Sequence, residues 1–170
     1  MTTRLMEDAD FKGFVSYVLD VCAEAIDAGE VVTPLAIVAR MNIEHGPSEV
    51  GVVNLSQAQA ESNERVAEIV KELASRPEFD LCCFVAEGTV SSTDLAPNES
   101  ALEARNRMAA AAPGADALPV VVTVVYSKER EAVGLHLLDR PKRLLQRGEL
   151  EFHGPSQATS MSGALVRLRH

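Results

Sequence analysis

Two strand-length apolar runs constrain the fold of this chain more than any other feature of its sequence. Residues Leu81–Ala86 are all apolar, and the β-branched run Leu118–Tyr126 is broken by Thr123. A continuous apolar run of this length is typical of a strand that is covered on both faces. We therefore expect a sheet in which Leu81–Ala86 lies near the centre.

The sequence around these runs predicts further strands and a smaller number of helices. Apolar residues recur at three- and four-residue steps over 8–28, which predicts a helix that ends before Gly29. Ser56 and Gln59 have the spacing of a capping box, so a second helix is expected from Ser56 to Ser75. Further elements are expected as strands at 31–41, 49–54, 133–139 and 149–153, a helix at 99–112 and one helical turn at 141–146.

The order of these elements favours hairpins over β-α-β units. It predicts an α+β fold: a mainly antiparallel sheet of about five to six strands with two or three helices packed on one side. Residues 1–153 are expected to form a single domain, and residues 154–170, rich in Gly, Pro, Ser and Thr, a flexible C-terminal tail. Because Pro34 cannot donate to a ladder, the strand at 31–41 is either an edge strand or begins after Pro34.

Composition and charge narrow the class of protein. Aromatic residues make up 4% of the chain and there is no Trp, which argues against modules that stack bases on aromatic rings. The net charge of -9 disfavours binding to nucleic acid and to anionic lipid. The last 44 residues are basic, which indicates either a tail for an acidic ligand or a surface that rests against the acidic body.

The sequence also predicts the compartment. The N-terminus has no apolar signal region, and no stretch reaches the 18 or so apolar residues that cross a bilayer. Three cysteines, two of them adjacent, fit neither a disulfide framework nor a zinc spacing. We therefore expect a soluble cytoplasmic protein with no membrane association.

The chain contains no motif that carries a known chemistry. It lacks GxGxxG, GxxxxGK[ST], HExxH, GxSxG and the EF-hand loop. No cofactor and no metal are therefore expected. Cys82 and Cys83 lie within the apolar run, where burial disfavours the reactive thiolate, so we interpret them as core residues.

Three residues are weak candidates for acid–base chemistry. His45 lies in a turn beside Glu44, His136 lies within the strand at 133–139, and Glu87 follows the buried run. The favoured interpretation of His45 is an exposed turn residue, that of His136 a half-buried structural residue and that of Glu87 the boundary of the sheet. Whether the chain is an enzyme stays open at this stage.

A basic cluster is the weak candidate for ligand binding. Arg140, Lys142, Arg143 and Arg147 lie within eight residues of one another. If the turn at 141–146 is helical, Arg143 and Arg147 share one face and could grip phosphate or a carboxylate-rich partner. The alternative interpretation is a solvated face.

Three functional hypotheses follow. The first is a non-enzymatic module for self-association or protein interaction, in which an edge strand such as 31–41 or 149–153 pairs across a two-fold axis. The alternative is a small enzyme or small-molecule binder with a pocket at the sheet end, using His45 or His136 and Glu87. Nucleic-acid binding through the basic tail ranks last.

Overall fold

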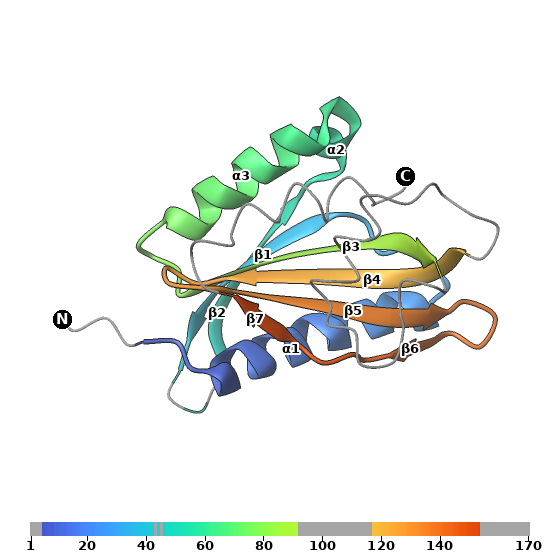
Figure 1. Ribbon diagram of the computed structural model, residues 1–170, viewed down its shortest axis with the longest axis horizontal. Coiled ribbons are helices and arrows are strands. Elements are labelled where there is room, and N and C mark those ends of the chain that lie inside the picture. The colour runs from blue at the N-terminus through green and yellow to red at the C-terminus, as the bar shows by residue number, and fades with distance from the viewer. Residues whose placement is uncertain (1–4, 43, 45, 92–116, 154–170) are drawn as a thin grey trace.

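The computed structural model describes ten helices and strands over residues 5–42, 44, 46–91 and 117–153. They are arranged as helices above and below a sheet (Figure 1). In chain order they are α1 (Asp8–Asp27), β1 (Leu35–Met41), β2 (Pro47–Asn54), α2 (Ser56–Glu61), α3 (Asn63–Ser75), β3 (Leu81–Ser91), β4 (Ala117–Tyr126), β5 (Glu131–Asp139), β6 (Leu144–Gln146) and β7 (Glu151–His153).

All described strands join one antiparallel sheet. Its order is β2-β1-β3-β4-β5-β6, and β7 pairs with β5 beside β6. The predicted α+β class and the mainly antiparallel sheet are therefore confirmed. The run Leu81–Ala86 forms the first part of β3, which lies between β1 and β4 as expected.

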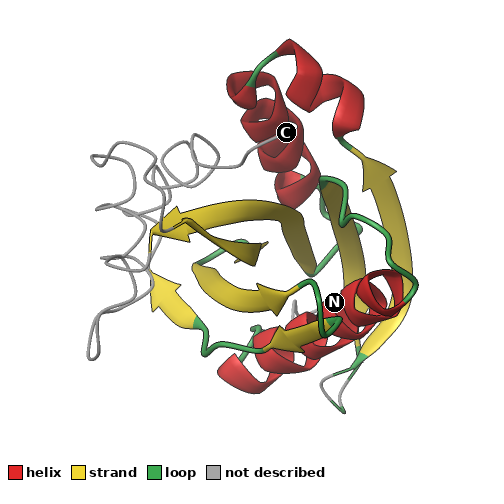
Figure 2. Ribbon diagram, turned by 90° about the vertical axis from the view of Figure 1, so that its right-hand side faces the viewer, coloured by secondary structure: helices red, strands yellow, loops and turns green. Residues whose placement is uncertain are grey.

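The helices cover both faces of this sheet, whereas the sequence had favoured one side. Cys82 contributes to the core beneath α2 and α3, and Cys83 to the core beneath α1. Figure 2 shows the strands between the two sets of helices. The physical reason is the continuous apolar sequence of the central strands, because alternate side chains point to opposite faces and each apolar face must be buried.

Helix α1 lies across most of the sheet, which curls around it (Figure 2). It contacts β1, β2, β3, β4 and β6. At its start the Glu7 N–H donates to the Asp10 carboxylate at 2.8 Å. At its end Gly29 takes a left-handed φ of 78°, and the Glu30 N–H donates to the Ala25 carbonyl at 2.9 Å. The predicted glycine cap is confirmed.

The helix predicted from Ser56 to Ser75 is two helices. Helix α2 ends at Glu61, and Ser62 begins α3 by accepting the Arg65 N–H at 3.0 Å. At the start of α2 it is Asn54 that accepts the Ser56 N–H, at 2.8 Å. A serine that can cap a new helix competes with continuation of the old one, which explains the break.

Two further expectations concern the sheet edges. Of the two alternatives for 31–41, the second is confirmed: β1 begins after Pro34, and it lies between β2 and β3 rather than at an edge. Residues 144–146 are the short strand β6, paired with β5, and not part of a helical turn. The expected helix at 99–112 and the expected tail at 154–170 lie outside the described residues. None of the helices in the described ranges is long and apolar enough to span a bilayer.

Candidate functional site

His136 lies on β5. It was predicted to be half-buried, and its side chain is fully buried. The Gly148 N–H donates to its Nδ1 at 2.9 Å, so Nδ1 carries no proton. Nε2 therefore carries the proton and donates to Thr123 Oγ1, also at 2.9 Å. Burial, followed by the charge of Arg147, lowers the pKa of His136 from 6.5 to about 4. Both ring nitrogens of His136 form hydrogen bonds within the protein, which is the environment of a structural histidine.

Glu87 lies on the same face of the sheet as His136 but does not reach it. The register aligns Glu87 with Val121 and Val121 with His136, so a whole strand separates the two side chains, a span of about 10 Å. The Glu87 carboxylate accepts the Val32 N–H at 2.7 Å and forms an ion pair with Arg140. The structure thus does not bring these two candidates together, and His45 lies outside the described residues.

The arginines of the basic cluster contact helix α1 and the segment just after it. Arg143 donates to the carbonyl of Asp27, the last residue of α1, and Arg140 donates to the Glu30 carbonyl beyond the helix, each at 2.7 Å. A cation at a helix C-terminus stabilises it, because the last carbonyls are otherwise unsatisfied. Arg147 pairs with the Asp20 carboxylate, about two turns earlier in the same helix. Three of the four predicted ligand-binding residues therefore hold α1 and the segment that follows it against the sheet.

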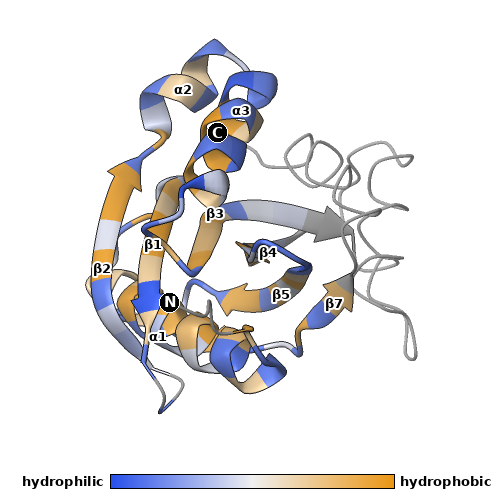
Figure 3. Ribbon diagram, turned by 90° about the vertical axis from the view of Figure 1, so that its left-hand side faces the viewer, coloured by the Kyte–Doolittle hydropathy of each residue, from blue (hydrophilic) through white to orange (hydrophobic). Residues whose placement is uncertain are grey.

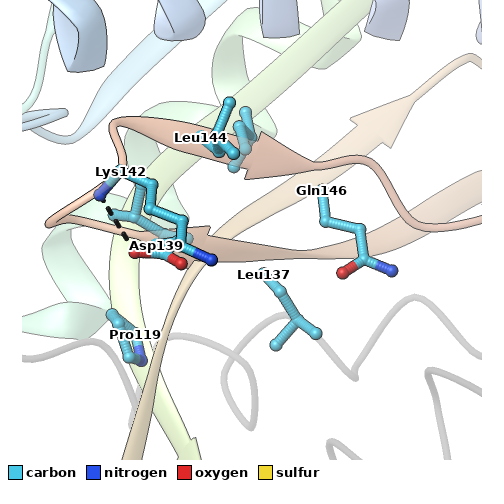
Figure 4. A pocket seen from close by; sticks show the side chains of 8 residues that line it. Pro119, Leu137, Asp139, Lys142, Leu144 and Gln146 are labelled. Atoms are coloured by element: carbon cyan, nitrogen blue, oxygen red, sulfur yellow. Dashed lines mark hydrogen bonds between the residues drawn. The ribbon is translucent and has the colours of Figure 1, made fainter.

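Lys142 lines a hollow on the surface of the protein. This hollow of about 460 Å³ lies against the β5–β6 turn and is lined by apolar side chains that include Leu137 and Leu144 (Figure 4). The Lys142 N–H donates to the Asp139 carboxylate at 3.1 Å, which fixes the turn. The cavity offers one cation and one carboxylate, and no further charged residue lines it in the part of the chain that is described.

A second cavity lies at the sheet end, where the alternative hypothesis expected one. It measures about 620 Å³ and lies between the segment before β1, helix α2 and the far end of β3. Glu87, Gln59 and Thr89 are among its polar lining residues. Because Arg140 and Val32 already engage the Glu87 carboxylate, the cavity wall presents a neutralised acid.

The three cysteines are buried, as predicted for Cys82 and Cys83. Burial raises the pKa of the Cys22 thiol to about 11 and that of Cys82 to about 12, and the pKa of Cys83 also lies well above its usual value. Thiols with such pKa values stay protonated at neutral pH and are poor nucleophiles.

The edge strand β2 carries two exposed apolar side chains. Val50 is 38% exposed and Val52 61% exposed. They pair with Ala39 and Ile37 of β1, so both valines lie on the α1 face of the sheet. No strand among the described residues pairs with this edge (Figure 3). An open edge presents unpaired backbone N–H and C=O groups, which are a template for another strand.

Helix α1, which contacts β2, also carries exposed apolar side chains. Ser16 and Asp20 contact Arg147. Tyr17 and Val21 are exposed and lie about one helical turn apart. We call the two exposed valines of β2, Val50 and Val52, the β2-edge surface.

The opposite end of the sheet is protected. The short strands β6 and β7 both cover β5, and each is three residues long. Short edge strands and nearby cations are the usual means by which proteins prevent edge pairing. Residues 149–153, expected as an edge that could pair with another chain, therefore form the blunted end, and the eight-residue β2 forms the open one.

Comparison with known proteins yields no relative: no family model, no curated protein and no solved structure matches this chain. The fold and the surfaces described above therefore stand on their own geometry.

Sequence reasoning missed the β2-edge surface although part of its signal was present. Val50 and Val52 alternate with Glu49 and Gly51, as in a strand with one apolar face. The alternation does not reveal that this face lacks a cover, because that depends on where α1 lies. The partners of His136 carried a weaker signal, since Thr123 is the one polar residue of an otherwise apolar run.

Proposed function

We propose that this chain is a non-enzymatic interaction module that binds another polypeptide by strand addition along β2. The observation that carries the proposal is the open, eight-residue edge of β2 with Val50 and Val52 exposed on one face. Added strands gain affinity from backbone hydrogen bonds and specificity from alternate side chains. The exposed valines would supply this specificity.

Two contrasts support this proposal. The β5 end of the sheet is blunted by short strands, so the open β2 edge is not a general property of the fold. The β2-edge surface also presents two large exposed hydrophobic side chains, Val50 and Val52, on one face of the same strand. Contiguous apolar surface of this kind marks interaction sites, whereas scattered apolar residues do not.

The alternative, a small enzyme or small-molecule binder at the sheet end, has weaker support. A cavity exists there, and Glu87 lines it. However, His136 is sealed between Thr123 and Gly148 on the far side of Val121. An acid–base pair needs both groups within reach of one substrate. The cavity would therefore act as a binding pocket, with Glu87 neutralised by Arg140.

Selection of peptides from a random display library on the purified chain tests the proposed function. We expect the selected peptides to carry alternating apolar residues and to bind Val52→Lys at least about 10-fold more weakly than the unchanged chain, because a lysine ammonium would be desolvated by the added strand. The matched control is Leu144→Lys, since Leu144 is 59% exposed and lies on β6, at the other end of the sheet.

Equal binding of the selected peptides to Val52→Lys and to the unchanged chain would contradict the proposal. So would loss of binding in Leu144→Lys alone, because it would move the docking surface to the cavity beside Lys142. Both variants replace exposed side chains, so both are expected to fold like the unchanged chain. Circular dichroism of the two variants checks this.

A further inference from the structure

Strand β2 has a sequence that suits pairing with itself. Gly51 lies at its centre, Val50 and Val52 flank the glycine, and Glu49 and Val53 come next. In an antiparallel pair related by a two-fold axis perpendicular to the sheet, opposed residues lie on the same face. The axis must therefore pass beside one residue of β2, and each choice of residue defines one register.

Resting on the proposed function, we propose that the partner of β2 is a second copy of this chain, paired antiparallel with Gly51 opposite Gly51. In this register Val50 of each copy lies opposite Val52 of the other. Four valines then adjoin on the α1 face of the continuous sheet. The surface that is exposed in one copy is covered by the same surface of the other.

The neighbouring registers do not match apolar residues in this way. With the axis at Val50, Val52 lies opposite Ser48. With the axis at Val52, Val50 lies opposite Asn54. Each of these registers leaves two valines beside polar side chains. Directly opposed apolar side chains stabilise a strand pair, so the Gly51 register is favoured.

Charge also permits a second copy at this edge, although the chain carries a net charge of -9. Glu49 is the one charged residue of β2, and it lies beside Arg40 of β1. In the Gly51 register Glu49 lies opposite Val53 of the second copy, so no two carboxylates are opposed. Like charges directly opposed would destabilise the pair.

Glycine at the axis is consistent with a close approach of backbones, which is one reason for glycine within a strand. A Cβ at Gly51 would also lie 3.1 Å from Cγ2 of Val38, so the position has a packing role within one copy. The continuous sheet of such a dimer has two ends, and both are the blunted β6–β7 ends. The assembly therefore closes as a dimer and does not extend as a fibre.

Mixed cysteine variants test both the partner and the register. Val50→Cys and Val52→Cys are prepared separately, mixed so that subunits exchange, and then oxidised. In the Gly51 register the two introduced thiols lie directly opposite each other only in the mixed dimer, at a Cβ separation of about 5 Å. We expect at least about 10-fold more disulfide-linked dimer from the mixture than from either variant alone.

Two controls accompany the mixture. The unchanged chain reports background, which is expected to be low because Cys22, Cys82 and Cys83 are buried. Light scattering after gel filtration reports mass: the unchanged chain is expected as a dimer, Leu144→Lys likewise, and Val52→Lys with a dimer dissociation constant raised at least about 10-fold.

The outcomes separate the two proposals. A chain that stays monomeric at high concentration, or a mixture that links no better than its parts, overturns the second copy as partner. If selected peptides still bind through Val52, the proposed strand addition survives that result. Efficient linking of Val50→Cys alone or of Val52→Cys alone overturns the Gly51 register.

Discussion

Replacement of Gly148 by alanine is expected to lower the free energy of unfolding by about 3 kcal/mol. A Cβ at this position would lie 2.2 Å from the carbonyl oxygen of Leu135, a backbone atom that no rotamer change can move away. The segment between β6 and β7 must therefore shift from β5. That shift also breaks the bond from the Gly148 N–H to Nδ1 of His136 and leaves a buried acceptor unsatisfied.

Urea unfolding of the two chains at neutral pH measures this effect, and Gly46→Ala is the matched control. The nearest atoms to a Cβ at Gly46 are those of the Asn42 side chain at 3.9 Å, which is ordinary contact. We expect the control to change the free energy of unfolding by less than about 0.5 kcal/mol. A Gly148→Ala chain as stable as the control would show that the segment relaxes without cost, and that His136 does not depend on it.

Local sequence predicted the elements whose character is decided by their own residues. The apolar run at Leu81–Ala86 indicated a central strand because its side chains need cover on both faces. Gly29 indicated the end of α1 because only a glycine takes its left-handed backbone without strain. Such signals are short-range, so they survive without knowledge of the rest of the fold.

Prediction failed where two local signals competed or where a distant element decided. The pattern over 56–75 fitted one helix, but Ser62 offered a cap within it and divided it. The basic cluster was considered as a ligand site, and the sequence did not indicate that its arginines contact α1 and the segment after it, more than 100 residues earlier. No periodicity or spacing within the cluster encodes that contact.

The candidate site was predictable only as a class. An edge strand able to pair with another chain was expected, with 31–41 and 149–153 as the examples. Sheet order decides which strand is last, and sheet order is a property of the whole chain. Once β2 is known to be the end strand of the sheet, the alternation of Val50 and Val52 indicates an apolar face that no neighbouring strand covers.

The stability of the protein is expected to fall as the pH falls, through the titration of His136. Its pKa is about 4 in the folded protein and about 6.5 when exposed. The unfolded chain therefore binds the proton more readily, and stability that is fully present above about pH 6.5 is lost as the pH falls toward about 4. The two pKa values differ by about 2.5. At about 1.4 kcal/mol per pH unit, this difference corresponds to about 3 kcal/mol of the free energy of unfolding.

The carboxylates of this acidic chain titrate in the same range, so the contribution of His136 must be isolated by difference. Urea unfolding between pH 8 and pH 4 is compared for the unchanged chain and for His136→Gln, which keeps polar groups but does not titrate there. The variant is expected to be less stable at pH 8, because the bonds to Thr123 and Gly148 are altered. Its stability is expected to fall by about 3 kcal/mol less across the range. Parallel pH profiles would contradict the buried neutral ring, since protonation of His136 would then cost the folded and unfolded chains the same free energy.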